Sequence, residues 1–401
     1  MDSLNKNNIK RILYFGYFDI MKSNGPGVNE FEFTRVLAKH YGKELWCVLP
    51  KPSAEVPHLE DVNTLIFRRP HHLNPISIFL TSIYLAVRMA WIFRRNRINL
   101  VVARMWYMPI ALLILTVVFR LPFALKTAGV PVSIRRRHIL SRIYWGFDDI
   151  LQGYLLGRAI LVDAVSHAYG EMLLRFVQPE KIAVIQNAAN TDFFQPMDNR
   201  ETKAELGIPD KWPVLGYVGG SPSERGARQL LETAKRILPE FPDLHVLIVG
   251  WDQELKHEEA EAEKIGIASH VRFLGQQPYS NIPALMNTID VGFSFGPAHQ
   301  RVVFSAQKAF QFFACGIPVV SIRENHEFIA ENDLGALAEA HDFNAIAEAT
   351  RTWAHRLKAN HREIQQHIRA YAVKHLSVDQ ALQTRLDFWA RNLAGQINPN
   401  A

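Results

Sequence analysis

The sequence predicts an α/β protein made of two Rossmann-like βαβ domains that face each other across a cleft. Short apolar runs alternate with helical segments in two successive series, which is the pattern of βα units around a parallel sheet. A polar, proline-bearing segment, Asn187–Arg200, separates the two series and reads as a linker. Glycine-bearing loops connect a strand to a helix in each half. Two βα domains on one linker place a cleft between their carboxyl-end surfaces.

Composition sets the outer limits of this interpretation. The chain has 401 residues, enough for two or three domains, and is 48% hydrophobic and 21% charged, as in ordinary globular proteins. A net charge of +6 only hints at acidic ligands or a membrane surface. The two cysteines, Cys47 and Cys315, show no metal-ligand spacing and suggest a reducing compartment. The first residues, MDSLNKNNIKRILYFGYF, do not have the pattern of a signal peptide.

The first predicted domain, residues 1–195, contains alternating apolar strands and helices. Its opening strand is followed by a loop with the sequence Asn24-Gly25-Pro26-Gly27, which lacks the three spaced glycines of a dinucleotide site. The expected strands are Arg11–Phe18, Leu45–Leu49, Leu100–Ala103, Phe123–Lys126, Ile160–Val165 and Ile182–Ile185. The expected helices are Asn29–Tyr41, Ile76–Phe93, Pro109–Phe119 and Ser166–Phe176.

The second predicted domain, residues 196–375, repeats the alternation. A last helix, Val378–Leu393, lies in residues 376–401 and is expected to pack back onto the first domain. The expected strands are Val214–Val218, His245–Val249, Val271–Leu274, Val291–Phe295 and Ile317–Ile322. The expected helices are Ala227–Leu238, Glu254–Ile265, Ile282–Thr288, Ala306–Ala314, Phe343–Leu357 and Ile364–Ala372.

The stretch Ser294–Glu331 carries one candidate site. Gly316 is expected to end the helix Ala306–Ala314 with a left-handed cap. Lys308 and Gln311 lie near the start of that helix, one turn apart. Helix starts at the carboxyl ends of parallel strands bind phosphorylated ligands, so a cation and an amide there suit a diphosphate and a sugar hydroxyl. The alternative is a core helix with a solvated lysine.

The loop Gly219–Gly226 carries a second candidate site. It is glycine-rich, opens a helix and contains Arg225, so backbone N–H groups and a guanidinium are available to a diphosphate. The alternative is a glycine-rich turn with an exposed arginine. No cluster of His, Cys or carboxylates has metal-ligand spacing and no Asp-x-Asp occurs, so we expect no metal and no cofactor.

The segment Ile76–Phe93 is unusually apolar and is followed by Arg94, Arg95 and Arg97. Its length approaches the roughly 20 residues of a membrane span, but Arg88 inside it argues against a simple span. A helix lying in the membrane interface, with arginines toward anionic headgroups, fits the pattern of residues 76–97 better. The alternative is a buried helix of the first domain.

Several blocks of the second half resemble the retaining GT-B glycosyltransferases of glycosyltransferase family 4. Ala314-Cys315-Gly316-Ile317-Pro318-Val319-Val320 resembles the family's most specific block, and Gly216–Gly226 resembles its glycine loop. The resemblance is strong over Asn187–Gly335 and weaker over the first domain. Other matching blocks are Val184–Phe194, Leu247–Gly250, Val271–Gly275, Pro283–Asp290, Asn24–Leu37 and Val162–Leu173.

The chain departs from the family pattern at charged positions. The family's paired glutamates, seven residues apart, fall on Val303 and Gln311, and its loop arginine falls on Gly220. Its loop lysine falls on Arg225, which keeps the charge, and a lysine found in some relatives matches Lys308. Glutamine can still bind a ribose hydroxyl, but without charge-assisted strength. These departures bear on the donor sugar and on whether activity is reduced.

The resemblance implies metal-independent, retaining transfer of a sugar from a nucleotide diphosphate sugar to an acceptor, a lipid-linked or polysaccharide glycan. The second domain would bind the nucleotide and the first the acceptor, at the cytoplasmic face of a membrane. Arg225 and Lys308 are the candidate catalytic residues, since positioned cations stabilise a leaving diphosphate. The candidate substrate-binding residues are Gly25, Gly27, Asn187, Gly219, Gly220, Ser221, Gln276, Tyr279, Ser294 and Gln311.

Two other functions remain open from the sequence. A GT-B epimerase acting on a nucleotide sugar would need acid–base carboxylates or histidines in the cleft, and no obvious set is present. A catalytically silent protein that binds a sugar nucleotide or glycan is suggested by the missing glutamates. Hydrolysis or transfer of a labelled nucleotide sugar separates these alternatives. No feature of the sequence indicates nucleic-acid binding.

Overall fold

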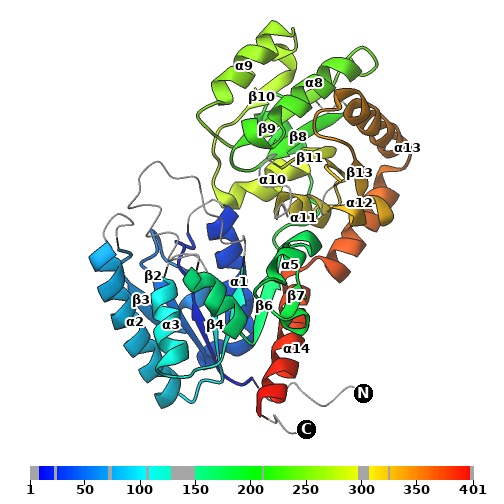
Figure 1. The fold of residues 1–401 in the computed structure, drawn as a ribbon. Coiled ribbons are helices and arrows are strands. Elements are labelled where there is room, and N and C mark those ends of the chain that lie inside the picture. The colour runs from blue at the N-terminus through cyan, green and yellow to red at the C-terminus, as the bar shows by residue number, and fades with distance from the viewer. Residues whose placement is uncertain are drawn as a thin grey trace. The chain divides into compact units, whose positions relative to one another are not determined.

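The computed structural model describes residues 9–21, 25–70, 75–104, 108–127, 150–209, 212–296, 307–323 and 326–397 (Figure 1). The chain divides into two compact units. The first combines Met1–Lys22, Pro26–Gln186 and Ala381–Ala401, and the second combines Ser23–Gly25 with Asn187–Gln380. Each unit is a parallel sheet with helices, so the predicted α/β class is confirmed.

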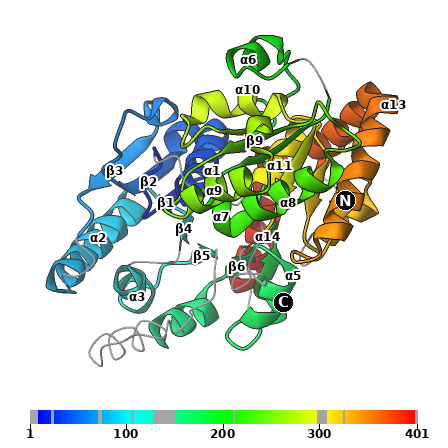
Figure 2. The same ribbon diagram turned by 90° about the horizontal axis from the view of Figure 1, so that it is seen from above.

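The first unit has a seven-stranded parallel sheet in the order β3-β2-β1-β4-β5-β6-β7. In Figure 2, α1 lies on one side of this sheet and α2 and α3 lie on the other. The strand order reverses between β1 and β4, which is where such sheets open a ligand crevice. The strands are β1 (Ile12–Phe15), β2 (Leu45–Pro50), β3 (Asn63–Phe67), β4 (Leu100–Arg104), β5 (Phe123–Lys126), β6 (Leu161–Ala164) and β7 (Ile182–Val184); the helices are α1 (Gly25–Tyr41), α2 (Pro75–Arg95), α3 (Pro109–Val117) and α5 (His167–Leu173).

The second unit has a six-stranded parallel sheet in the order β10-β9-β8-β11-β12-β13, which reverses between β8 and β11. The strands are β8 (Val214–Val218), β9 (His245–Val249), β10 (Val271–Phe273), β11 (Val291–Ser294), β12 (Val319–Ser321) and β13 (Gly335–Leu337). The helices are α6 (Arg200–Glu205), α7 (Pro222–Arg225), α8 (Ala227–Ile237), α9 (Leu255–Lys264), α10 (Ile282–Asn287), α11 (Gln307–Ala314), α12 (Glu327–Glu331) and α13 (Phe343–His375); α14 (Val378–Ile397) runs on into the first unit.

The strands of the second sheet are apolar throughout because both faces are covered. Along β8, Leu215 and Tyr217 point into the core beneath α8 and α9, whereas Val214 and Val218 point into the core beneath α10 and α11. This alternation of side chains between two buried faces explains the continuous hydrophobic runs. The exact match of β8 and β9 to their predicted ranges has the same cause.

Helix α13 contributes to both of these cores because it bends. Asn360 has non-helical angles, φ −140° and ψ 46°. Trp353, before the bend, packs in the core beneath α8, and Ile368, after it, packs in the core beneath α11. The two helices predicted over Phe343–Leu357 and Ile364–Ala372 are therefore the two arms of one bent element.

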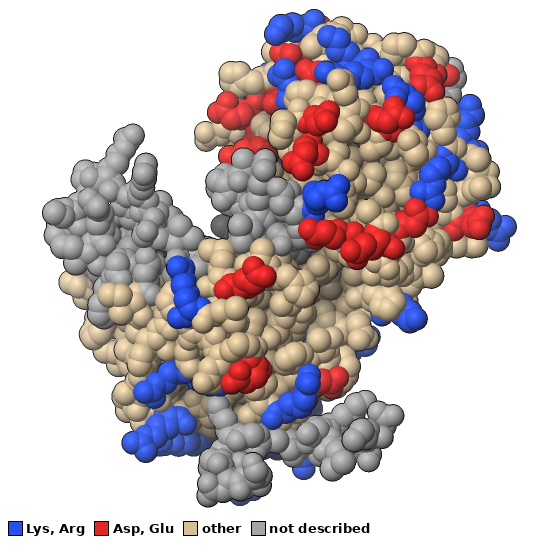
Figure 3. All heavy atoms as spheres, turned by 45° about the vertical axis from the view of Figure 1, so that its right-hand side comes forward, with Lys and Arg blue, Asp and Glu red and all other residues tan. Residues whose placement is uncertain are grey.

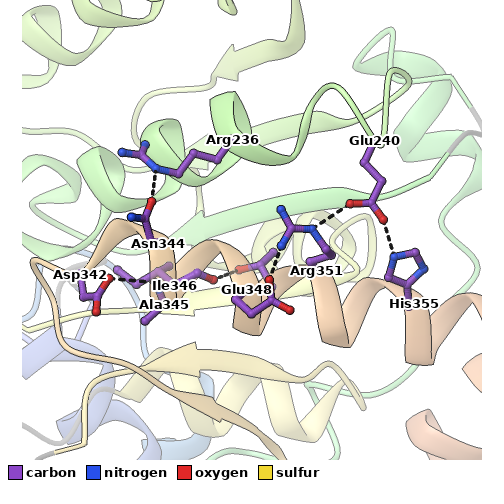
Figure 4. A network of polar contacts seen from close by, with 10 residues as sticks. Arg236, Glu240, Asp342, Asn344, Ala345, Ile346, Glu348, Arg351 and His355 are labelled. Carbon is purple, nitrogen blue, oxygen red and sulfur yellow. Dashed lines mark hydrogen bonds and ion pairs between the residues drawn. The ribbon is translucent and has the colours of Figure 1, made fainter.

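Polar contacts join α8 to the first arm of α13 (Figure 4). The Nε of Arg236 donates to the Oδ1 of Asn344 at 3.1 Å, and the Nε of Arg351 donates to Glu240 at 2.8 Å. His355 lies 2.6 Å from the other oxygen of Glu240. Hydrogen bonds from His355 and Arg351 lower the pKa of the Glu240 carboxyl. These exposed contacts orient the arm, while the apolar core beneath it supplies the stability.

Several sequence predictions need correction. Helix α1 begins at Gly25 rather than Asn29, because Pro26 and Gly27 form its first turn, where a proline is tolerated. The loop Gly219–Gly226 contains the short helix α7. Among the other elements that were not predicted, β3 and β13 are edge strands with little apolar pattern, and α6 and α12 are only six and five residues long.

Charged residues at the carboxyl edge of the first sheet form a buried network. The hydroxyl of Tyr14 donates to Glu30 at 2.6 Å, and Arg104 donates to the other Glu30 oxygen at 3.2 Å. The Nε of Arg385, on α14, donates to Asp163 at 2.5 Å. Both side chains of this second pair are more than nine-tenths buried. The pair therefore fixes α14 against β6 within the first unit.

We predict that Arg385→Met lowers the free energy of unfolding of the first unit by about 3–5 kcal/mol, because it removes the hydrogen-bonded cation of the buried Asp163 carboxylate. Chemical denaturation, with hydrogen exchange of the α14 amides to separate the two units, measures the effect. Arg391→Met, at an exposed position of the same helix, is the matched control. Equal stability of the two variants would contradict the prediction.

Candidate functional site

The candidate site lies within the second unit, at the carboxyl ends of β8 and β11, where the strand order reverses. The chain leaves β8 through Gly219, whose N–H donates to the carbonyl of Val249 at 2.9 Å. Gly219 has φ +148° and Ser221 has φ +54°, so the loop turns sharply before α7. Glycine turns that lead into a helix at this edge of a parallel sheet are places where other proteins hold phosphates.

A second glycine, Gly250, makes this turn possible. It follows β9, has φ +136°, and its N–H donates to the carbonyl of Gly275 at 2.8 Å. A Cβ at Gly250 would lie 1.8 Å from the carbonyl oxygen of Gly219. The backbones after β8, β9 and β10 are therefore packed against one another with no room for a side chain.

Asp252 fixes the short helix α7. One of its oxygens accepts from the N–H of Ser223 and the other from the Ser223 hydroxyl, both at 2.9 Å. The N–H of Glu254 donates to the same carboxylate at 3.0 Å. Helix α7 ends with Arg225, and Gly226, at φ +131°, leads directly into α8. The hydrogen bonds of Gly219 to Val249 and of Ser223 to Asp252 thus hold the loop that carries Arg225.

Lys308, in the first turn of α11, is the second cation of the site. Its ammonium lies 3.6 Å from the centroid of the Tyr217 ring, and the side chain is buried. Burial, and to a lesser extent the nearby charge of Arg225, lowers the pKa of Lys308 well below its usual range. The two predicted cations are therefore close enough to repel each other. Among the residues that the structure describes, no ion pair joins Lys308 to a carboxylate.

Tyr217 belongs to the site but was not among the residues predicted from the sequence. Its ring supports the Lys308 ammonium, and its hydroxyl donates to the carbonyl of Gly220 at 2.8 Å. One side chain thus links the glycine loop to α11. A tyrosine within a buried strand has no distinguishing sequence signal, so only the contact reveals its role. Burial raises the pKa of its hydroxyl, which keeps the ring neutral beneath the cation.

The remaining predicted residues divide into two groups. Gln311 is buried one turn after Lys308, and Gly219, Gly220 and Ser221 form the loop described above. Ser294 is the last residue of β11; its Oγ is buried and has no hydrogen-bond partner among the described residues, so it is enclosed by protein. Of the other predicted residues, Asn187 is half-buried at the start of the unit, Gln276 is exposed after β10, and the ring of Tyr279 stacks on that of Phe193, with 5.2 Å between the centroids.

Two further predictions concern other parts of the chain. Val303, the position of the first missing glutamate, lies outside the described residues. Gly25 and Gly27 lie in the first turn of α1 rather than in a loop, with Gly25 exposed and Gly27 buried. Within the residues that the structure describes, no group of three or more His, Cys, Asp and Glu residues is placed to hold a metal ion.

Within the described residues, cavities also lie away from this loop. One of about 10 Å³, room for a single water, lies beside Gly16 and Arg104 at the carboxyl ends of β1 and β4 in the first unit. A larger one of about 250 Å³ lies at the amino ends of β11 and β12 in the second unit, beside Asn287, Asp290 and Pro318. The larger cavity is therefore at the opposite end of these strands from Lys308.

The surface of the second unit carries both signs of charge. Figure 3 shows Lys and Arg interspersed with Asp and Glu over it. On the face drawn, neither sign of charge predominates over the second unit.

We predict that Lys308→Met raises the free energy of unfolding of the ligand-free second unit by about 1–3 kcal/mol in mildly acidic buffer, since it removes a buried charge. Because the pKa of Lys308 is lowered in the folded chain, the unfolded chain binds more protons between that pKa and about 10.4. The destabilisation is complete below the folded pKa and fades as the pH rises toward 10.4.

The gain in stability from Lys308→Met should therefore shrink as the pH rises. Denaturation of the variant and the wild type across a pH series measures this difference. Lys235→Met, at an exposed position of α8, is the control and should show no such dependence. A gain that stays constant with pH would show that the ammonium is not destabilised by burial.

In a comparison with known proteins, the second half of the chain matches a family of known activity. Residues 198–372 match the family described as "Glycosyl transferases group 1". A D-inositol 3-phosphate glycosyltransferase from Corynebacterium jeikeium is 31% identical over 182 residues, which is 42% of each chain. The match thus spans about two fifths of the length of this curated relative.

Solved structures match over nearly the whole chain. Anabaena Alr3699/HepE in complex with UDP has a TM-score of 0.69 at 17% identity, covering 95% of this chain and 100% of the other. WaaG, a glycosyltransferase involved in lipopolysaccharide biosynthesis, has a TM-score of 0.64 at 16% identity, covering 94% and 98%. These identities show the shared fold. The chain therefore has the two-sheet GT-B fold, and residues 198–372 of its second unit match the family of glycosyl transferases group 1.

Proposed function

We propose that the protein transfers a sugar from a nucleotide diphosphate sugar to a lipid-linked or polysaccharide glycan, with retention of configuration and without a metal ion. The observation that carries the proposal is the buried Lys308 ammonium, which lies over Tyr217 near Arg225 at the glycine turn. A site with two cations, and with free N–H groups expected at its turn, is suited to a diphosphate. The family match of residues 198–372 supports glycosyl transfer as the reaction.

The same geometry supplies a mechanism for leaving-group stabilisation. As the bond between the sugar and the diphosphate breaks, negative charge grows on the phosphate oxygens. Lys308 and Arg225 are already in position, so no reorganisation is needed when the charge appears. The unfavourable burial of the ammonium is relieved most in the transition state, which is the condition for catalysis rather than for tighter binding alone. Gln311 is proposed to bind a ribose hydroxyl.

Relatives support the choice of substrates. The structural neighbour HepE is described in complex with UDP, which favours a uridine diphosphate sugar as the first donor to test. WaaG is described as acting in lipopolysaccharide biosynthesis, which supports a glycan acceptor. The first unit is proposed to bind that acceptor, and the reaction is proposed to occur at the cytoplasmic side of the membrane.

We predict that one nucleotide among UDP, GDP and ADP stabilises the protein, by about 2.7 kcal/mol at 100 times its dissociation constant. The matching labelled nucleotide sugar should be hydrolysed or transferred in the presence of EDTA. Thermal unfolding followed by product analysis measures both effects. Loss of turnover in EDTA with rescue by Mg²⁺ or Mn²⁺ would overturn metal independence. Binding without turnover would indicate a silent sugar-nucleotide-binding protein, and stabilisation by none of the three would place the diphosphate elsewhere.

We predict that Lys308→Ala and Arg225→Ala each reduce turnover by about a hundredfold or more, the loss typical of removing one transition-state contact of about 2.7–4 kcal/mol. Lys308→Arg should restore little, because a planar fork does not fit the space of a point charge over Tyr217. Lys235→Ala, on the exposed side of α8, should keep full turnover. Steady-state kinetics on the folded variants measures these changes in turnover. Near wild-type rates for Lys308→Ala would refute the assignment of Lys308 to the leaving diphosphate.

A further inference from the structure

Helix α2 has two apolar faces, and the fold covers only one of them. Leu85, Ala86 and Met89 are buried in the first unit, where α2 packs against α3. The opposite face exposes a row of large apolar side chains, each between 36% and 71% exposed: Ile76, Phe79, Leu80, Ile83, Tyr84, Val87 and Trp91. These seven residues are called the α2 stripe below.

The α2 stripe follows helical spacing and is long. Its members recur at intervals of three and four residues, so they lie along one side of the helix. From Ile76 to Trp91 the stripe runs about 22 Å at 1.5 Å per residue. Single exposed apolar residues are common, but a continuous row of this length marks an interaction surface.

The charges around the stripe are all of one sign. Residues 75–99 contain Arg88, Arg94, Arg95 and Arg97 and no acidic residue. Arg88 and Arg95 lie over the Trp91 ring, at 5.6 and 4.8 Å from its centroid, and all four arginines are exposed. In the described part of the chain, no ion pair joins Arg88, Arg94 or Arg95 to a carboxylate. Apolar side chains flanked by tryptophan and arginine suit the boundary between acyl chains and phosphate headgroups.

A second group of exposed apolar residues lies at the end of α3, the helix that packs against α2. Val117 and Val118, at the end of α3, are exposed, and Arg94 lies over the Phe119 ring at 5.4 Å from its centroid. Because α2 contacts α3, the stripe and these valines belong to one side of the first unit. Two apolar elements with arginines between them bind a flat anionic surface better than a single helix does.

We propose that the α2 stripe inserts into the surface of an anionic lipid bilayer, with α2 parallel to the membrane plane and its arginines on lipid phosphates. The helix has the length and hydropathy of a membrane span, but a span would require its packed face to leave the first unit. A symmetric dimer through the stripe would bring the arginines of two copies together, which opposes association. The proposal is independent of the glycosyl transfer proposed above, because it concerns lipid binding alone.

Vesicle flotation of the full chain tests the proposal. Binding is expected to phosphatidylcholine vesicles that contain phosphatidylglycerol, to weaken as salt is raised, and to be slight with phosphatidylcholine alone. Leu80→Glu and Val87→Glu should each reduce binding at least tenfold. Leu174→Glu, at an exposed apolar position outside the stripe, should leave it unchanged. Arg88→Gln and Arg95→Gln should each weaken binding about fivefold, the equivalent of about 1 kcal/mol per arginine.

Three results would overturn the proposal. Equal absence of binding to both kinds of vesicle would remove it. Binding that Leu80→Glu and Val87→Glu leave intact would place the lipid contact elsewhere. A dimer in light scattering that the same two variants dissociate, without vesicle binding by the wild type, would make the stripe a protein interface. Circular dichroism of each variant checks that the exposed substitutions leave the fold intact, and resistance of bound protein to alkaline extraction would indicate a span.

Discussion

The candidate site of the second unit is built around one contact, the Lys308 ammonium placed over the Tyr217 ring. A buried cation is unfavourable unless an anion or a π-face compensates for lost water, and the ring compensates only in part. The arrangement persists because Tyr217 lies in β8, where both faces of the sheet are packed, and because Gly219 and Gly250 hold the loop above it. Within the unit, the ammonium is therefore left only partly compensated.

In the first unit, by contrast, the buried carboxylates have hydrogen-bonded partners within the protein. Glu30 receives hydrogen bonds from Tyr14 and Arg104, and Asp163 receives one from Arg385, so cations and carboxylates there largely compensate one another within the protein. Such a network stabilises and orients the carboxyl edge of the sheet. The two similar sheets thus differ: carboxylates pair with arginines at the edge of the first, whereas the Lys308 ammonium at the edge of the second lies over a tyrosine ring, with no ion pair to a carboxylate among the described residues.

The local sequence determined most of the architecture. Apolar runs between glycines and polar segments located β8 and β9, Gly316 ended α11 at φ +76°, and Ser166 caps α5 by accepting from the N–H of Tyr169 at 3.2 Å. These features follow from side-chain periodicity and backbone preference, which act over a few residues. Edge strands β3 and β13 escaped prediction because one neighbour and partial exposure leave little pattern to detect.

The sequence by itself placed Arg225 in a glycine-rich loop before a helix and Lys308 near the start of another helix, and it showed that the segment of α2 is apolar around most of its circumference. Only the tertiary structure decided that Tyr217 lies beneath Lys308, that Gly250 must lack a side chain because of Gly219, and which side of α2 is covered. Each of these is a contact between segments distant in the chain. Such contacts arise from the register and packing of whole elements, which leave no trace in the local pattern of either segment.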